Sequence, residues 1–304
     1  MANLVRSAAA AGPLARTVDH AAVTRYLFLV PYLIVFALFR FGPIAGGWLI
    51  SLTRWSLIGS PRWVGAANYR ALWHDPLFWV SVKNTLAFTA VAGPMLVLGG
   101  LALALLVDQP LRGRHLARVM IFAPYAVMSA VVGVLWNWLY DTNFGILNYY
   151  LRLVGLPVVA WLTNERVALA AIALTTVWWT VGYNMVIFLA GLQEVPVELH
   201  EAAIVDGATF WQRFRSITLP LLTPTTYAVV ILTLINTGQV FDQIYVMTAG
   251  GPGTATLTLV QYMYYQAFQT YNLGYGAAIA YATFVVLLVV TLIVQRLFRR
   301  EVAA

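Results

Sequence analysis

Long apolar runs alternate with shorter polar stretches along this chain. A membrane-crossing helix needs about 20 apolar residues to span about 30 Å of hydrocarbon. Six runs meet this requirement and predict helices at about 26–50, 84–107, 119–140, 168–191, 220–243 and 276–295. The runs are continuous and do not alternate in ten-residue pieces, which excludes a transmembrane β-barrel. The pattern therefore predicts an all-α integral membrane protein with six transmembrane helices.

The composition agrees with this prediction. Hydrophobic residues make up 61% of the chain and charged residues only 10%, against about 25% charged residues in an ordinary soluble domain. A soluble core cannot absorb so much apolar surface, so the excess must face lipid. The net charge of +7 is interpreted as a signal for membrane orientation rather than for nucleic-acid binding, because Arg and Lys concentrate in cytoplasmic loops.

The positions of Arg and Lys predict the side of the membrane on which each loop lies. If the N-terminus is cytoplasmic, the inside segments hold eleven arginines and the outside loops hold five. The inside segments are 1–25, 108–118, 192–219 and 296–304, and the outside loops are about 52–82, 141–167 and 244–275. The count predicts that both termini, including the tails 1–25 and 301–304, are cytoplasmic.

The candidate chemistry of the chain is sparse. Its one lysine, Lys83, lies in VSVKNT and lacks the preceding glycines of a nucleotide-binding P-loop. We therefore expect no ATP site, no cofactor and no enzymatic activity in this chain, so that any ATP is bound by another subunit. The histidines are scattered and predict no metal site, and no Ser–His–Asp arrangement is readable; they are His20, His74, His115 and His200.

The segment 194–220 is a polar interruption between two apolar runs. Four of the eleven acidic residues fall between Glu194 and Asp206. VELHEAAIV and ATFWQRFRSI predict two short helices, separated at Asp206–Gly207 because Gly tolerates turn conformations. Pro220 and Pro224 then open the next membrane helix, since Pro is tolerated in a first turn. From these residues alone, the segment is either an interfacial helix on the membrane or a docking element for a partner protein.

The segment resembles the EAA loop of ABC importer permeases, the membrane subunits of binding-protein-dependent uptake systems. The resemblance lies in EAA, followed after two residues by DGA, then by ITLP and by a second proline at Pro224. In that family the loop forms a coupling helix in a groove of the ATP-binding subunit. The resemblance implies that Glu201 pairs with a basic group of that subunit and that Gly207 makes the bend. The implied coupling residues are Glu201, Ala202, Ala203, Asp206, Gly207, Ala208, Phe210, Trp211 and Phe214.

Two further segments, 63–89 and 241–280, resemble carbohydrate-uptake permeases of the maltose and glycerol-phosphate type, in the first-permease half. The resemblance implies the type I ABC importer architecture and a bacterial or archaeal cytoplasmic membrane. It also implies a sugar substrate of di- or oligosaccharide size and several partners. These are a second homologous permease, ATPase subunits that hold ATP and Mg, an extracytoplasmic solute-binding protein and membrane lipid, with no nucleic acid.

Polar side chains in and near the predicted fifth helix are the candidates for the substrate path: Asn236, Gln239, Asp242 and Tyr245. The alternative is that such groups bond to one another between helices, and that most aromatic residues form interface belts. Asn84 and Asn137 are weaker candidates.

Arg40 is the other intramembrane charge and is expected to snorkel towards the outer interface or to form a structural pair. It is the only mid-helix cation, which favours a neutral sugar over a solute such as glycerol 3-phosphate, although both remain open. An ion-driven secondary transporter would need ionisable relays across several helices. A membrane scaffold whose loop only holds a partner is the third alternative.

Overall fold

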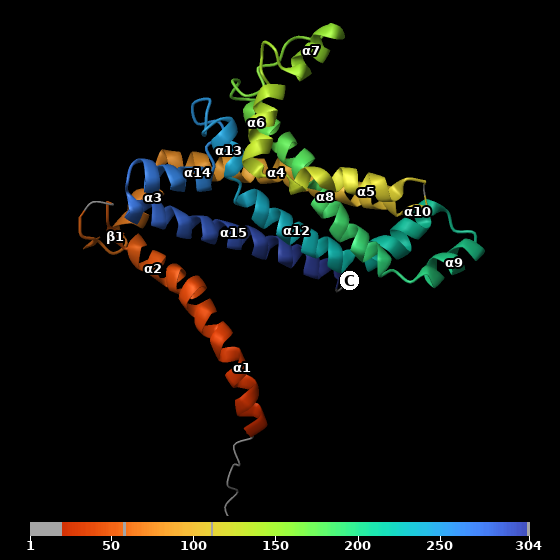
Figure 1. The fold of residues 1–304 in the computed structure, drawn as a ribbon, viewed down its shortest axis with the longest axis horizontal. Coiled ribbons are helices and arrows are strands. Elements are labelled where there is room, and N and C mark those ends of the chain that lie inside the picture. Colours follow the sequence, from red (N-terminus) through yellow and green to blue (C-terminus); the bar gives the residue numbers. More distant parts are fainter. Residues whose placement is uncertain (1–19, 57–58, 111, 303–304) are drawn as a thin grey trace, which may run out of the picture. The chain divides into compact units, whose positions relative to one another are not determined.

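The computed structural model of the protein describes residues 20–56, 59–110 and 112–302, which are almost entirely helical (Figure 1). Most of the predicted N-terminal tail, and the last two residues of the chain, lie outside these described residues. The chain divides into two compact units, Met1–Leu49 and Ile50–Ala304. Each unit is considered by itself.

The first unit is built around one long apolar helix in three sections: α1 (His20–Phe36), a π-helical turn η1 (Ala37–Phe41) and α2 (Gly42–Ser51), which runs just into the second unit. Pro43 has no backbone N–H to donate, and the π-helical turn lies directly before it, where the Gly42 N–H donates to the Ala37 carbonyl. Arg40 is exposed in this turn. Residues Leu27–Ser51 are long and apolar enough to cross a membrane.

The second unit is organised around four long helices: α4 (Pro76–Asp108), α8 (Ala168–Gln193), α12 (Thr223–Gly238) and α15 (Leu273–Val302). α4 packs extensively on α8, because Gly100 lets the two backbones approach closely. A Cβ atom at Gly100 would lie 2.7 Å from Cβ of Asn184. Small residues allow such close packing between membrane helices. α4 begins well before residue 84 because Asp75 caps it, with its carboxylate accepting from the Leu77 N–H (2.9 Å) and Pro76 in the first turn.

The predicted continuous third helix, 119–140, is wrong. The structure has α5 (Arg114–Phe122), a 3₁₀ turn η2 (Ala123–Ala126) and α6 (Ser129–Leu139), and the two helical arms are bent by 97°. Pro124 interrupts the α-helical ladder by lacking an N–H, and Val127 is extended at the end of the turn. The indole N–H of Trp179 donates to the freed Val127 carbonyl (3.0 Å), so α8 stabilises the break.

The predicted fifth helix, 220–243, is also interrupted. It begins with a short α11 (Leu219–Leu221), continues as α12, and resumes after a break as α13 (Asp242–Met247). The hydroxyl of Thr258 donates to the Val240 carbonyl inside the break (3.2 Å), so the irregular backbone is satisfied by the protein itself.

The remaining segments lie at or near the ends of the long helices. They are the antiparallel pair β1 (Thr53–Arg54) and β2 (Arg62–Trp63), α3 (Ala67–Trp73), α7 (Ile146–Leu153), α14 (Leu259–Tyr264) and the π-helical turn η4 (Tyr265–Gln269).

The uncharged loop TAGGPGTAT packs against protein, since Thr256 is fully buried and Asn84 donates to the carbonyls of Thr254 and Leu257. Asn137 likewise donates to the Val246 carbonyl. Both asparagines therefore have structural partners.

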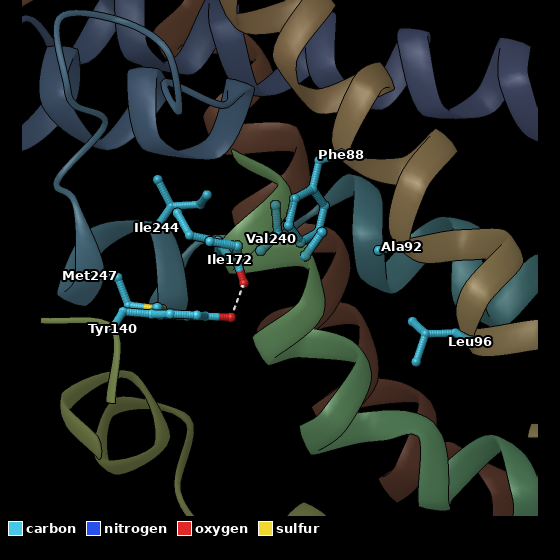
Figure 2. Close-up of a cluster of buried hydrophobic side chains, with 10 residues drawn as sticks. Phe88, Ala92, Leu96, Tyr140, Ile172, Val240, Ile244 and Met247 are labelled. Atoms are coloured by element: carbon cyan, nitrogen blue, oxygen red, sulfur yellow. Dashed lines mark hydrogen bonds between the residues drawn. The ribbon is translucent and has the colours of Figure 1, made fainter. Parts of the chain in front are cut away.

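A hydrophobic cluster joins α4, α8 and α13 to the end of α6 (Figure 2). Phe88 and Ile172 are fully buried in it, and the hydroxyl of Tyr140 donates to the Ala171 carbonyl (2.9 Å).

Among the described residues, five helical spans are long and apolar enough to cross a membrane, and six if the bent pair α5–α6 counts as one span. The predicted all-α membrane fold is confirmed.

Candidate functional site

The polar segment 194–220 folds as α9 (Val197–Val205), α10 (Phe210–Arg213) and a π-helical turn η3 (Phe214–Thr218). The break between α9 and α10 lies at Gly207, which has φ +78°, a left-handed conformation that glycine adopts readily. Thr209 starts α10 with a capping box, in which its side chain accepts from the Gln212 N–H and the Gln212 side chain accepts from the Thr209 N–H. Local sequence alone thus determines a helix–turn–helix element.

The outer surface of this element is apolar and exposed. Val205, Phe210 and Trp211 are 87%, 61% and 62% exposed, and the rings of Trp211 and Phe214 stack at 5.4 Å. Glu201, Ala202 and Asp206 are also exposed. Between the two helices lies a hollow of about 340 Å³, lined by Ala203, Asp206, Gly207, Ala208, Gln212, Arg213, Ser216 and Ile217. Exposed aromatic residues beside a polar hollow are typical of a protein-docking surface.

Three of the segments that the arginine count assigns to the inside belong to the second unit, and the helices that hold them reach one end of that unit (Figure 1). α9 and α10 lie at this end, and so does the start of α5. Arg118 of α5 donates to the Val107 carbonyl at the end of α4 (2.8 Å). The last turns of α15 reach the same end, where the rings of Tyr227 and Phe298 are 5.7 Å apart. The basic ends of α5 and α15 thus lie at the same end of the second unit as the helix–turn–helix element.

A cleft of about 280 Å³ lies among α4, α8, α12, α13 and η2. Three of the four residues predicted for the substrate path line it, namely Asn236, Gln239 and Asp242. Tyr245 lies outside the lining and packs on the rings of Phe241 and Tyr264. The lining residues are Leu96, Tyr125, Thr176, Trp179, Thr180, Tyr183, Asn184, Thr233, Asn236, Thr237, Gln239, Val240, Phe241, Asp242 and Gln243.

One wall of the cleft is aromatic. Tyr125 of η2 stacks on Tyr183 of α8 with ring centroids 5.0 Å apart and lies 6.1 Å from the ring of Trp179. None of these three residues is among those predicted from the sequence. A signal was nevertheless present on α8, where polar and aromatic side chains recur every three or four residues: Thr176, Trp179, Thr180, Tyr183 and Asn184. This spacing places them on one face of a helix.

Most of the remaining lining residues are polar. The Asn184 amide of α8 donates to the Thr233 hydroxyl of α12 (3.0 Å), so these two helices are joined beside the cleft. Asp242 begins α13 and accepts a hydrogen bond from the Ser129 hydroxyl at the start of α6 (2.5 Å). Among the lining residues, all of which are described, Asp242 is the only charged one, and none is Arg or Lys. The cleft combines aromatic faces with neutral hydrogen-bonding groups and one carboxylate.

A second polar cluster joins α14 and α15 to the start of α4. The Asp75 carboxylate accepts hydrogen bonds from the hydroxyls of Tyr262 and Tyr275, both at 2.5 Å. Partial burial would by itself raise the pKa of Asp75, but the bonds from Tyr262, Tyr275, and the Leu77 and Phe78 backbone together hold that pKa below its usual value. The cluster therefore depends on an ionised carboxylate.

Replacing Asp75 by asparagine is expected to lower the thermal unfolding midpoint of the purified protein at pH 7 by about 3–8 °C, because charge-assisted hydrogen bonds are lost. The pKa of Asp75 is lower in the folded protein than in the unfolded chain. The ionised carboxylate therefore stabilises the folded state above about pH 4, and this stabilisation is lost as the pH falls further. The difference between wild type and variant should therefore stay constant from pH 7 to about pH 4 and shrink as the pH falls further. An unchanged midpoint at pH 7 in a fluorescence melt would contradict this role.

Comparison with known proteins decides the family. Residues 96–303 match the family described as "Binding-protein-dependent transport system inner membrane component". The chain belongs to this family. The permease is 37% identical over 282 residues to the trehalose/maltose transport system permease protein MalF of Thermococcus litoralis, covering 91% of this chain and 94% of that protein. It is 34% identical over 279 residues to the sn-glycerol-3-phosphate transport system permease protein UgpA of Agrobacterium fabrum, covering 91% and 95% of the two chains.

The permease also has the fold of a solved importer. Its structure matches one chain of a bacterial alginate ABC transporter in complex with an alginate pentasaccharide-bound periplasmic protein. The TM-score is 0.79 at 23% identity, and the match covers 93% of this chain and 96% of that chain. The predicted type I ABC importer architecture and the resemblance to carbohydrate-uptake permeases are therefore confirmed. The permease is a multi-pass membrane subunit of an ABC importer.

Proposed function

We propose that the permease forms one half of the path through which an ATP-driven importer moves a neutral sugar of di- or oligosaccharide size into the cytoplasm. An external solute-binding protein delivers the sugar, and a second homologous permease completes the path. Two ATPase subunits bind ATP and Mg on the cytoplasmic side, one of them at α9 and α10. The permease itself carries out no covalent chemistry, and both of its termini face the cytoplasm.

The observation that carries this proposal is the composition of the cleft. Sugars present apolar C–H faces, which pack on aromatic rings, and hydroxyl groups, which need hydrogen-bond partners. The cleft is lined by the rings of Tyr125, Trp179 and Tyr183 and by several amides and hydroxyls. A few polar groups placed among apolar and aromatic surfaces are typical of small-molecule sites.

The same cleft disfavours an anionic solute. The UgpA relative is named for glycerol 3-phosphate, and a phosphate would require Arg or Lys for charge-assisted hydrogen bonds. The charged group in the described lining is the carboxylate of Asp242, which would repel a phosphate across a site of low dielectric constant. A glycerol-phosphate solute therefore remains only the alternative.

The two interrupted helices suggest how the path opens and closes. Tyr125 in the turn before the first break and residues 239–241 in the second break all line the cleft. Beyond the breaks, α6 and α13 pack closely on each other, because a Cβ atom at Gly133 would lie 2.9 Å from the Val246 side chain. Breaks next to a rigid pair can act as hinges. We infer that α6 and α13 move together at the outer side of the cleft when the ATPases close.

Uptake in proteoliposomes tests the proposal. The vesicles contain the permease, its second permease and the ATPase, with the binding protein and labelled maltose, trehalose or glycerol 3-phosphate added. Wild type is expected to take up a sugar and not the phosphate. Trp179→Ala should reduce that uptake at least tenfold, because burying an apolar face of the sugar against the indole ring contributes roughly 1.5–3 kcal/mol. Uptake of glycerol 3-phosphate alone would overturn the sugar proposal.

Trp178→Ala is the control for this experiment. Trp178 neighbours Trp179 on α8 but lies outside the cleft lining, and its ring packs on Trp136 instead (5.5 Å). The control should keep most of the uptake per folded complex. Equal loss in both variants would mean that α8 is sensitive to any truncation and that Trp179 does not contact the solute.

A further inference from the structure

Gln243 differs from the other buried polar side chains that line the cleft. The others are Thr176, Asn184, Thr233 and Thr237. The hydroxyls of Thr176 and Thr237 donate to helix carbonyls, and Asn184 donates to the Thr233 hydroxyl. Gln243 is only 4% exposed, yet its Nε2 has no hydrogen-bond partner in the described part of the chain.

An unpaired amide at this position is costly to the fold. Leaving a buried donor unsatisfied costs about 1–3 kcal/mol, and such groups in a native protein call for a specific explanation. The neighbouring core residues of α13, Ile244 and Met247, are apolar and buried. An apolar side chain of similar size at 243 would serve packing better, so folding alone does not account for the glutamine.

We propose that the Gln243 amide hydrogen-bonds a hydroxyl of the solute in the cleft and so helps to select a polyhydroxyl compound. This inference rests on the proposed function and deepens it. The last torsion of a glutamine side chain is soft, so the amide can turn either its nitrogen or its oxygen to the cleft. It lies directly after Asp242, whose carboxylate also lines the cleft. An amide that both donates and accepts matches a hydroxyl group, which does the same.

The test compares solute transport with ATP hydrolysis in the complete reconstituted complex. Gln243→Leu is expected to lower the amount of maltose or trehalose moved per ATP about tenfold, because solute is bound less tightly while the ATPase still cycles. Gln243→Asn, which keeps the amide, should restore part of this ratio. The thermal midpoint of Gln243→Leu should stay equal or rise, since an unpaired buried donor has been removed.

Gln261→Leu is the matched control. Gln261 is also buried (3% exposed) and its Oε1 also has no partner among the described residues, but it lies in α14 and outside the cleft lining. The control should transport solute at the wild-type ratio to ATP. The same tenfold loss in both variants would assign the effect to core packing and overturn the proposal.

The remaining outcomes separate this inference from the proposed function. If wild type moves none of the sugars, the proposed function fails before the variants are compared. If wild type moves a sugar and Gln243→Leu moves it at an unchanged ratio to ATP, the sugar function stands and the role of Gln243 is refuted.

Discussion

Gly207→Val is expected to reduce solute uptake more than tenfold and to abolish stimulation of the partner ATPase by the solute-loaded binding protein. Gly207 has φ +78°, where a residue with a Cβ atom is strained by roughly 1–2 kcal/mol and a β-branched residue is a genuine outlier. No atom lies within 4 Å of a Cβ built there. The effect is therefore one of backbone conformation, which sets the position of α9 relative to α10.

The matched control for this prediction is Gly113→Val. Gly113 also has positive φ (+86°) with no atom within 4 Å of its Cβ position, and it caps α5. The start of α5 lies at the same end of the second unit as α9 and α10 (Figure 1). If Gly207 acts through the coupling element, the control should retain far more uptake. Gly207→Asn should fall between the two, because asparagine enters the left-handed region more readily than valine. Wild-type uptake and ATPase stimulation in Gly207→Val would rule out the coupling role.

Gly182→Ala is expected to reduce the amount of folded permease in the membrane severalfold. A Cβ atom at Gly182 would lie 2.3 Å from the Ile121 carbonyl oxygen and 2.8 Å from Cα of Phe122. These are backbone atoms, which cannot move aside as a flexible side chain can, so α8 and α5 would have to separate. The separation would also displace Tyr125 and Tyr183, whose rings stack at the cleft.

Gly93→Ala is the control for this second prediction. Gly93 lies inside α4 and has no atom within 4 Å of its Cβ position, so alanine should be accommodated and should raise helix stability by up to about 1 kcal/mol. Folded yield is measured by size-exclusion chromatography of the solubilised protein. Wild-type yield for Gly182→Ala would show that α5 and α8 are less tightly packed than the structure indicates.

Several assignments of partners remain predictions. The pairing of Glu201 with a basic group, and the insertion of Phe210, Trp211 and Phe214 into a groove of the ATPase, rest on the resemblance of the EAA segment. The structure contributes the exposure of Phe210 and Trp211 and the adjoining polar hollow.

The candidate site was only partly predictable. Asn236, Gln239 and Asp242 could be named because polar groups in an apolar run are visible in the sequence itself. Tyr125, Trp179 and Gln243 could not be separated from ordinary interface aromatics and core amides by sequence reasoning. Only the packing of η2, α8 and α13 around one cleft distinguishes them. Tyr245 was also predicted for the substrate path, but its side chain lies outside the cleft lining, against Phe241 and Tyr264.

The sequence by itself determined the membrane character, the number of apolar spans and the helix–turn–helix form of 194–220. Each of these depends on local properties: hydropathy over about 20 residues, capping residues, and a glycine at one turn. Only the tertiary structure decided the 97° bend between α5 and α6, the break before α13 and the composition of the cleft. Hydropathy reports how apolar a segment is and carries no information on the direction in which its helix runs. A cleft depends on which faces of segments distant in sequence pack together.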